Sequence, residues 1–141
     1  MLGKTHLLSA TLLGIVLIKH FSFSLFFFSG LLLGSIFPDI DSKTSILGRK
    51  FKFLNQFMKH RGIFHSLFML VLLYFILIIF SKRFALGFAI GFIFHLLLDI
   101  ITKEGLNTLF FGKIKGPIKV GGWQENIFLI MMILITLFIV L

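Results

Sequence analysis

The sequence predicts an all-α protein: a polytopic membrane helix bundle of about five transmembrane helices, with one short interfacial amphipathic helix. Composition is the first observation, because 58% of the 141 residues are hydrophobic and only 13% are charged, whereas a soluble domain carries about 25% charged residues. The second is that the apolar residues gather in five segments separated by polar stretches. The third is that no segment alternates with a strand's period of two, and only helices and closed barrels satisfy their backbone in lipid. At this length we expect a single domain over residues 1–141.

Each of the five apolar segments is expected to form one helix. They are 15 to 18 residues long, slightly shorter than the ~20 residues that cross a bilayer perpendicularly. The first, with Lys4 near its start, could also be a signal peptide, but no Ala-x-Ala-like cleavage site follows it, so we expect a retained helix. The segments are residues 2–18, 21–37, 63–80, 84–101 and 127–141.

The connections between the segments are of two kinds. Links of two and three residues join the first segment to the second and the third to the fourth, which predicts two tight antiparallel helix pairs. Residues 39–62 and 102–126 form long loops. The first long loop has apolar residues at helical spacing, which predicts the amphipathic helix in the membrane interface, and we interpret it as an anchor in preference to a lid. Those apolar residues are Leu47, Phe51, Leu54 and Met58.

Charge predicts the partner and the orientation. The net charge is +9, from 14 Lys and Arg against 5 Asp and Glu. With this hydropathy we expect contact with anionic membrane lipids and none with nucleic acid. With five spans, the N-terminus and both long loops share one face, which carries every basic residue except Lys19, Lys82 and Arg83. The positive-inside rule therefore predicts that the N-terminus and both long loops lie in the cytoplasm and the C-terminus lies outside.

Two segments carry glycines at a four-residue spacing, Gly30 with Gly34 and Gly87 with Gly91. Small residues at this spacing allow two helix backbones to approach closely. We therefore expect these glycines to lie in helix-packing interfaces.

Ionisable residues inside or at the ends of the apolar segments form the candidate site, because such residues are costly in a membrane and usually functional. Alternating helix directions bring these ends to one depth, and residues 95 and 99 lie on one helical face. The sequence has no cysteine, so the donors are imidazoles and carboxylates, which suit Zn²⁺, with Mn²⁺ or Fe²⁺ also open. The expected ligands are His6, Asp39, His65, His95 and Asp99, with Asp41 as a bridging or further ligand if two ions bind.

Each of these features has an ordinary explanation when taken alone. A histidine at a helix start is more often a cap or an interfacial residue than a ligand, and a Pro-Asp-x-Asp turn usually makes only local hydrogen bonds. His95 and Asp99 could satisfy each other in lipid. Their convergence at one depth favours the metal site, because the ordinary explanations would all have to hold at once.

Three segments resemble the YdjM-like family of inner-membrane proteins, which are described as membrane-bound metal-dependent hydrolases. His6, residues 102–105, and Gly121-Gly122 with Glu125 are similar to that family as well, so the resemblance covers nearly the whole chain. The segments are residues 37–41 (Phe-Pro-Asp-Ile-Asp), 60–66 (His-Arg-Gly-Ile-Phe-His-Ser) and 95–99 (His-Leu-Leu-Leu-Asp).

One residue departs from the family pattern, and one spacing resembles a second group of proteins. Phe64 stands where the family more commonly has Thr, which affects a hydrogen bond around the site and no ligand. The spacing of His95 and Asp99 is also similar to zinc-dependent phospholipases C and single-strand nucleases, a weaker resemblance that implies phosphodiester chemistry.

The leading hypothesis is a metal-dependent hydrolase that cleaves a phosphoester at the cytoplasmic membrane surface. A site at headgroup depth rimmed by lysines favours a phospholipid or an isoprenoid phosphate as substrate. A bound ion would polarise a phosphoryl oxygen and lower the pKa of a water to about 7. Arg61 could clamp a phosphate or contact a headgroup, while His60 or Glu125 could act as general acid or base. The candidate catalytic residues are Asp41, His60, Arg61 and Glu125.

The alternative is a metal-binding membrane transporter or scaffold without hydrolytic activity. A transporter is expected to place its ligands near the bilayer midplane, often beside a broken helix. Here the ligands gather at one end of the helices, which favours the hydrolase. A bundle of this size buries little surface per helix, so a homo-oligomer is compatible with the sequence.

Overall fold

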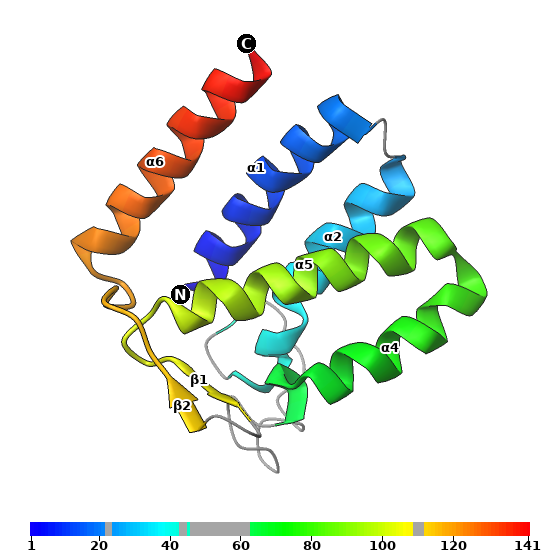
Figure 1. The fold of residues 1–141 in the computed structure, drawn as a ribbon, viewed down its shortest axis with the longest axis horizontal. Helices are drawn as coiled ribbons and strands as arrows, with labels where there is room; N and C mark the ends of the chain where they lie inside the picture. Colours follow the sequence, from blue (N-terminus) through cyan, green and yellow to red (C-terminus); the bar gives the residue numbers. More distant parts are fainter. Residues whose placement is uncertain (22–23, 43–44, 46–62, 109–111) are drawn as a thin grey trace.

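The computed structural model describes residues 1–21, 24–42, 45, 63–108 and 112–141. Five α-helices form the framework of this described part, which confirms the predicted all-α class and its five helices (Figure 1). Two short 3-10 turns, η1 (Pro38–Asp41) and η2 (Ile63–His65), lie between helices. The helices are α1 (Gly3–Phe21), α2 (Leu25–Ile36), α4 (Leu67–Phe80), α5 (Lys82–Ile100) and α6 (Trp123–Val140).

Serine side chains determine where three of the helices begin. The Oγ atoms of Ser24, Ser66 and Ser81 accept hydrogen bonds from backbone N–H groups three residues further along, at the starts of α2, α4 and α5. Ser81 also ends α4, so a single residue separates α4 from α5. The predicted three-residue turn is therefore too long. The predicted segment 63–80 is too long as a helix, because its first residues form η2.

Glycines bring α2 and α5 into backbone contact, as predicted from their spacing. A methyl group added at Gly34 or Gly91 would collide with the backbone carbonyl of Phe88 or Leu31 on the facing helix. Gly30 and Gly87 make the equivalent close approaches. Both helices run toward the same end of the molecule, because the elements that follow each of them lie there. This contact is the closest packing in the bundle and places the ends of α2 and α5 next to each other.

The other helices pack around this pair. In Figure 1, α4 lies antiparallel to α5, and α6 lies beside α1. A buried apolar cluster between α4 and α5 includes Leu70, Phe88 and Phe92, and a second between α1 and α2 includes Ala10, Phe27 and Leu31. These clusters orient the first turns of α1 and α4 toward the end of the α2–α5 pair.

A β-hairpin follows α5 and was not predicted. Strands β1 (Leu106–Thr108) and β2 (Gly112–Ile114) pair antiparallel, with Leu106 opposite Ile114. Each strand has only three residues, too few for a period of two to be recognised. Gly105, with φ of 63°, turns the chain into β1, because glycine adopts this left-handed conformation without steric cost.

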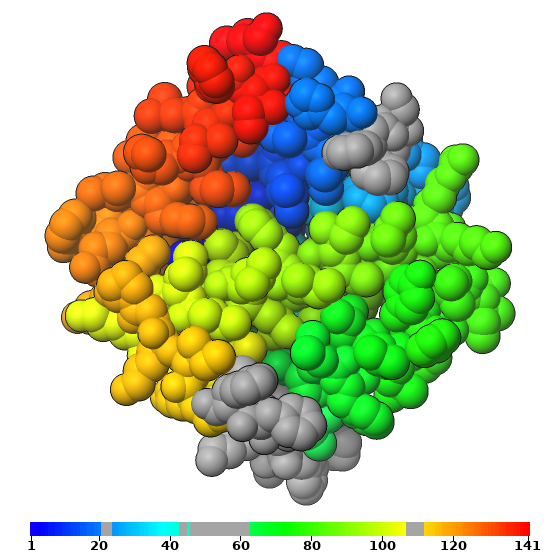
Figure 2. All heavy atoms as spheres, viewed as in Figure 1, coloured from blue at the N-terminus to red at the C-terminus, as the bar shows by residue number. Residues whose placement is uncertain are grey.

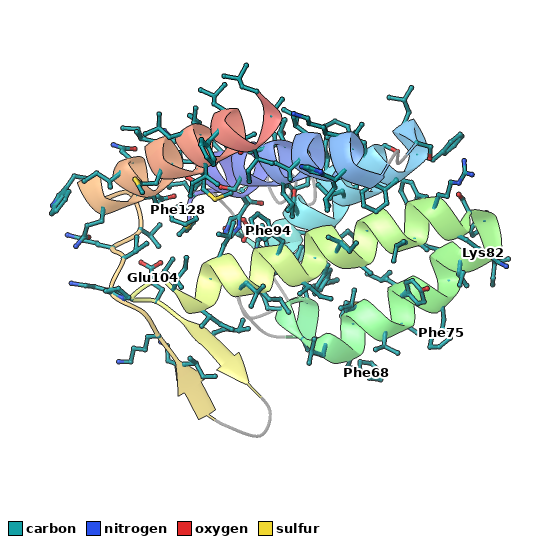
Figure 3. All side chains as sticks on the ribbon, turned by 45° about the horizontal axis from the view of Figure 1, so that its top comes forward. Phe68, Phe75, Lys82, Phe94, Glu104 and Phe128 are labelled. Atoms are coloured by element: carbon teal, nitrogen blue, oxygen red, sulfur yellow. The ribbon has the colours of Figure 1, made fainter. Side chains whose placement is uncertain are left out.

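Large apolar side chains cover the outside of the helices. Figure 3 shows Phe68 and Phe75 of α4 directed away from α5, and both side chains are largely exposed. In the space-filling view, α6 forms a broad part of the surface, and most of its apolar side chains are exposed (Figure 2). Within the described residues, α5 and α6 are long and apolar enough to cross a membrane, and α4 is a shorter apolar helix. Five spans stay a prediction.

Candidate metal centre

Six sequence-predicted site residues lie together at one end of the bundle. His6 comes from the first turn of α1, Asp39 and Asp41 from η1, His65 from η2, and the remaining pair from the last turns of α5. None of the six is more than 9% exposed. The structure therefore brings together groups that lie up to about ninety residues apart in the chain. The six residues are His6, Asp39, Asp41, His65, His95 and Asp99.

Two imidazole nitrogens and two carboxylate oxygens of this cluster lie within 4 Å of one another in five of their six pairs. His95 Nε2 lies 3.4 Å from His65 Nε2, 3.7 Å from Asp99 Oδ2 and 3.9 Å from Asp39 Oδ1. His65 Nε2 lies 3.6 Å from the same Asp99 oxygen and 3.7 Å from the same Asp39 oxygen. Nitrogen and oxygen ligands of a tetrahedral Zn²⁺ are about 3.3 to 3.6 Å apart. These five pairs are thus only slightly more widely spaced than the ligands of a tetrahedral ion.

A hydrogen bond at its second ring nitrogen fixes the orientation of His95. Its Nδ1–H donates a hydrogen bond to the backbone carbonyl oxygen of Ser35 at 2.7 Å. Because a carbonyl only accepts, Nδ1 carries the proton and the Nε2 lone pair points toward the carboxylates. Metal-binding histidines are usually oriented in this way by their second ring nitrogen.

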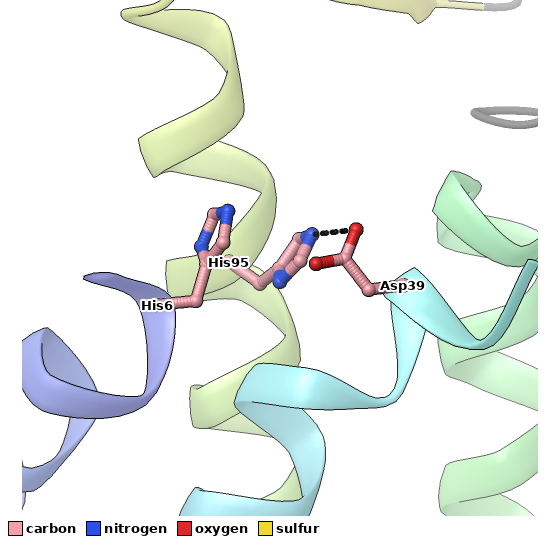
Figure 4. Close-up of side chains that lie close together, drawn as sticks. All are labelled: His6, Asp39 and His95. Carbon is pink, nitrogen blue, oxygen red and sulfur yellow. Dashed lines mark ion pairs between the residues drawn. The ribbon is translucent and has the colours of Figure 1, made fainter. Parts of the chain in front are cut away.

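His6 adds a further donor, on the side of His95 that faces away from Asp39 (Figure 4). The two rings stack with centroids 3.8 Å apart (Figure 4), and His6 Nε2 lies 3.4 Å from Asp99 Oδ1. The His6 ring is fully buried, and neither nitrogen has a hydrogen-bond partner among the described residues. Leaving a buried polar atom unsatisfied costs about 1–3 kcal/mol, which a bound cation would offset. Two groups, His6 with Asp39 and His95, and His65 with His95 and Asp99, have donor atoms close enough to hold an ion.

Asp41 contacts the other ring nitrogen of His65. Its Oδ2 lies 3.6 Å from His65 Nδ1, while Nε2 of the same ring lies near Asp39, His95 and Asp99. This geometry favours Asp41 as a group that orients His65 over the predicted bridging ligand, because a carboxylate behind an imidazole sets the ring orientation and raises its basicity.

The charges of η1 and η2 are coupled. Burial raises the pKa of Asp39, but the hydrogen bond from His65 and the nearby histidines outweigh burial and lower it below its usual value. Burial lowers the pKa of His65, but Asp39 and Asp41 outweigh burial and raise it to about 9. Without an ion, His65 therefore carries a proton at neutral pH between the two carboxylates. A cation would take the place of that proton, since ligands must be deprotonated to bind a metal.

Comparison with known proteins identifies the family. The YdjM inner membrane protein family matches residues 1–141. The chain belongs to that family. It is 30% identical to uncharacterized protein YvsG of Bacillus subtilis (strain 168) over 141 residues, covering 92% of this chain and 88% of YvsG. No solved structure matches.

In this YdjM family protein, Glu125 braces the candidate centre without entering it. One carboxylate oxygen accepts hydrogen bonds from Leu2 N–H at 2.8 Å and from the Thr5 hydroxyl, and the other accepts from Gly121 N–H at 2.7 Å. Both oxygens are occupied, and they join the start of α6 to the turn of α1 that carries His6. This favours a structural role over the predicted general base.

Three groups around the centre were missed by the sequence reasoning. The Ser35 carbonyl holds His95, Thr5 binds Glu125, and the α-amino group of Met1 lies 2.7 Å from Asp99 Oδ1. Two of the three are backbone or terminal groups, which residue type does not reveal. Thr5 could have been suspected from its position next to His6.

Some predicted residues lie outside the described part of the chain. His60 and Arg61, and the predicted amphipathic helix with Leu47, are among residues that the structure does not describe. Phe64 is described, and its ring lies edge-on against Phe37 with centroids 6.0 Å apart. At this position the YdjM family protein therefore has an apolar contact next to the histidine of η2.

Proposed function

We propose that this YdjM family protein is a membrane-embedded, metal-dependent hydrolase that cleaves a phosphoester of a lipid or lipid-linked substrate at the cytoplasmic membrane surface. The observation that carries the proposal is the set of four buried donor atoms from His65, His95, Asp39 and Asp99, spaced 3.4 to 3.9 Å apart in five measured pairs. Zn²⁺ is the proposed ion, because two imidazoles and two carboxylates match its preferred donors and a tetrahedral spacing. Mn²⁺ and Fe²⁺ are the alternatives.

The membrane placement rests on the apolar surface of the helices. The exposed faces of α4 and α6 are built from large apolar side chains, which a soluble monomer rarely leaves uncovered over such an area. All five helices are proposed to span the bilayer, with the N-terminus and both long connections in the cytoplasm and the C-terminus outside. The metal centre then lies at the cytoplasmic headgroups, because every element that contributes to it ends or begins there.

The residues around the proposed ion have separable tasks. When bound, the ion supplies a Lewis acid for a phosphoryl oxygen and lowers the pKa of a water. The Ser35 carbonyl fixes His95, and Asp41 fixes His65. His6, with its two unsatisfied nitrogens, is the proposed ligand of a second ion or a fifth ligand of the first.

The proposed reaction is hydrolysis of a phosphorus–oxygen bond. The oxygen of water bonds to phosphorus while the bond to the leaving alcohol breaks, one water proton passes to a base, and the leaving oxygen takes up a proton. His60 is proposed to give the leaving oxygen its proton. Arg61 is proposed to hold the phosphate through its planar guanidinium group. Lipid phosphates are favoured over soluble ones because the centre lies at the depth of the headgroups in the proposed arrangement.

The depth of the donors favours hydrolysis over transport. His95 and Asp99 lie in the last turns of α5, and the other donors lie in η1 and η2 or in the first turn of α1. A transporter would be expected to hold its ion near the bilayer midplane, at a break in a helix, and α5 is continuous from Lys82 to Ile100.

Metal content and lipid hydrolysis test the proposal together. The full chain is purified with Zn²⁺ present, and bound metal is measured by mass spectrometry for the wild type, His95→Ala and Asp39→Ala. His20→Ala is the matched control, because His20 is exposed at the other end of α1. We expect stoichiometric metal in the wild type and control and a loss in both site variants.

Turnover then separates the two candidate functions. Phosphate or phosphorylated headgroup release is measured from vesicles of bacterial phospholipids and from isoprenoid phosphates. Release that requires His95 supports the hydrolase. Stoichiometric metal without turnover on any phosphoester would instead support a metal-binding scaffold or transporter, and a metal-free wild type would remove both.

A further inference from the structure

A basic surface lies beside the candidate metal centre, on the hairpin between α5 and α6. Four lysines there are exposed, and the described residues from Thr102 to Trp123 contain a single acid, Glu104. In Figure 3 the hairpin extends beyond the end of α5 and away from the helices. We name this basic surface the hairpin face, and it consists of Lys103, Lys113, Lys115 and Lys119.

The hairpin is held in one position relative to α5. Lys103 N–H donates to the Ile118 carbonyl at 2.7 Å, and Gly116 N–H donates to the Thr102 carbonyl at 2.9 Å. Thr102 follows α5 by only two residues and is fully buried. The hairpin face therefore keeps a fixed place next to the turn of α5 that carries the donors.

The first residue of β1 anchors the hairpin on the protein, whereas all three residues of β2 are exposed. Leu106 is buried in the apolar cluster with α4 and α5, and it pairs with Ile114 across the strands. Residues directly opposite each other share a face, and neighbours along a strand point to opposite faces. Lys113, next to Ile114 in β2, therefore points away from the protein, and Lys115 directly after the strand is exposed as well.

Trp123 marks the depth of the hairpin face. It begins α6, is 71% exposed, and is the only tryptophan in the sequence. Indole rings gather at the membrane–water interface. Only three residues separate Lys119 from Trp123, so Lys119 lies near the level at which α6 enters the bilayer in the proposed arrangement.

We infer that the hairpin face is a docking surface for the headgroups of an anionic bilayer. Exposed lysines spread along a fixed hairpin match a charged surface, and each contributes about 1 kcal/mol near anionic lipid. This corresponds to about a 5-fold change in affinity per lysine. The inference rests on the membrane placement in the proposed function, and it does not depend on metal binding or hydrolysis.

Trp123 fluorescence provides the test, because no other tryptophan contributes to the emission. The purified full chain in a neutral detergent is titrated with mixed micelles of increasing phosphatidylglycerol content, and the mole fraction at half of the emission change is measured. We expect that midpoint to rise about 5-fold for Lys113→Gln. The double variant Lys113→Gln/Lys115→Gln should show no transition over the same range.

The matched control is Lys82→Gln/Arg83→Gln, which removes two positive charges at the opposite end of α5 and should keep the wild-type midpoint. Added salt should raise the wild-type midpoint, since the Debye length falls from about 10 Å at 0.1 M to about 3 Å at 1 M. Phosphatidylcholine should produce no transition. Thermal melting checks that the variants are folded.

Three results would overturn the inference. They are a wild-type midpoint in the double variant, an equal response to phosphatidylcholine, and displacement of the lipid by soluble glycerophosphoglycerol, which would indicate a site for free anions. His95→Ala should bind anionic lipid normally. Failure of the metal proposal and failure of the docking surface are therefore distinguishable.

Discussion

Adding one methyl group between α2 and α5 should weaken the metal centre from a distance. Gly91 lies one turn before His95, and a Cβ atom there would lie 2.9 Å from the Leu31 carbonyl carbon and 3.0 Å from Ser35 N. Carbon atoms in contact are normally about 3.5–4.0 Å apart, and the Leu31 carbonyl oxygen would lie closer than either atom, so the helices must separate by roughly 1 Å in Gly91→Ala. All three obstacles are backbone atoms and cannot move aside by changing a rotamer.

The separation moves donors from two helices apart. Asp39 follows α2, and His95 lies on α5, 3.9 Å from it. A metal–ligand distance tolerates about 0.2 Å, so we expect Gly91→Ala to reduce metal affinity by roughly 10–100-fold, the effect typical of disturbed outer-shell contacts. The overpacked contact should also reduce the free energy of unfolding by about 1–3 kcal/mol.

Gly87→Ala is the matched control, because it places the same methyl against the Phe27 carbonyl one turn further from the centre. Metal affinity is measured by competition with a chromophoric chelator, and stability by thermal melting with chelator present. We expect similar destabilisation in the two variants and a larger loss of metal affinity in Gly91→Ala. A folded Gly91→Ala protein with wild-type metal affinity would refute the view that this helix contact sets the donor spacing.

Three further predictions follow from the surroundings of the donors. Asp41→Asn removes the charge behind His65 and should lower metal affinity by about 10–100-fold, measured with the same chelator competition. Because the pKa of His65 is raised to about 9, metal affinity should increase with pH and level off near pH 9, where no proton has to be displaced. The stability that protonated His65 gives the metal-free protein should be complete below its unfolded pKa of about 6.5 and be lost as pH rises through about 9, so melting curves with chelator should shift downward over this range. Glu125→Ala should reduce stability by about 1–3 kcal/mol by leaving Leu2, Thr5 and Gly121 donors unpaired, whereas an altered shape of the pH–rate profile would indicate a general base instead.

Hydropathy was sufficient to predict the helices but not their ends. The long apolar segments have no competing structure in lipid, so five helices followed from composition. The ends depend on single serines such as Ser81, whose side chain caps α5 and whose backbone ends α4. Hydropathy averaged over a whole segment does not detect the effect of one hydroxyl group. The hairpin was missed because three-residue strands such as Leu106–Thr108 are shaped by pairing and not by periodicity.

The convergence of the site residues could be predicted, but their separate tasks could not. Alternating helix directions were enough to expect His6, His65 and His95 at one end. Sequence spacing does not show which face of a ring a neighbour contacts, so Asp41 was expected as a bridging ligand although it lies behind His65. The Ser35 carbonyl was invisible for another reason, because every residue has a carbonyl and only the packing of α2 against α5 selects this one.

The direction of the two central helices gives a physical reason for a cation at this end of the bundle. α2 and α5 both end at the centre, and helix C-termini carry a partial negative charge of about half an elementary charge. Their glycine contact holds these two ends side by side, and three of the four closest donor residues, Asp39, His95 and Asp99, belong to these ends. The closest packing in the bundle therefore holds together two helix C-termini, the helix ends that favour a cation. Mutations that separate α2 from α5 should consequently affect the ion before they unfold the helices, which is the order of events that Gly91→Ala is designed to reveal.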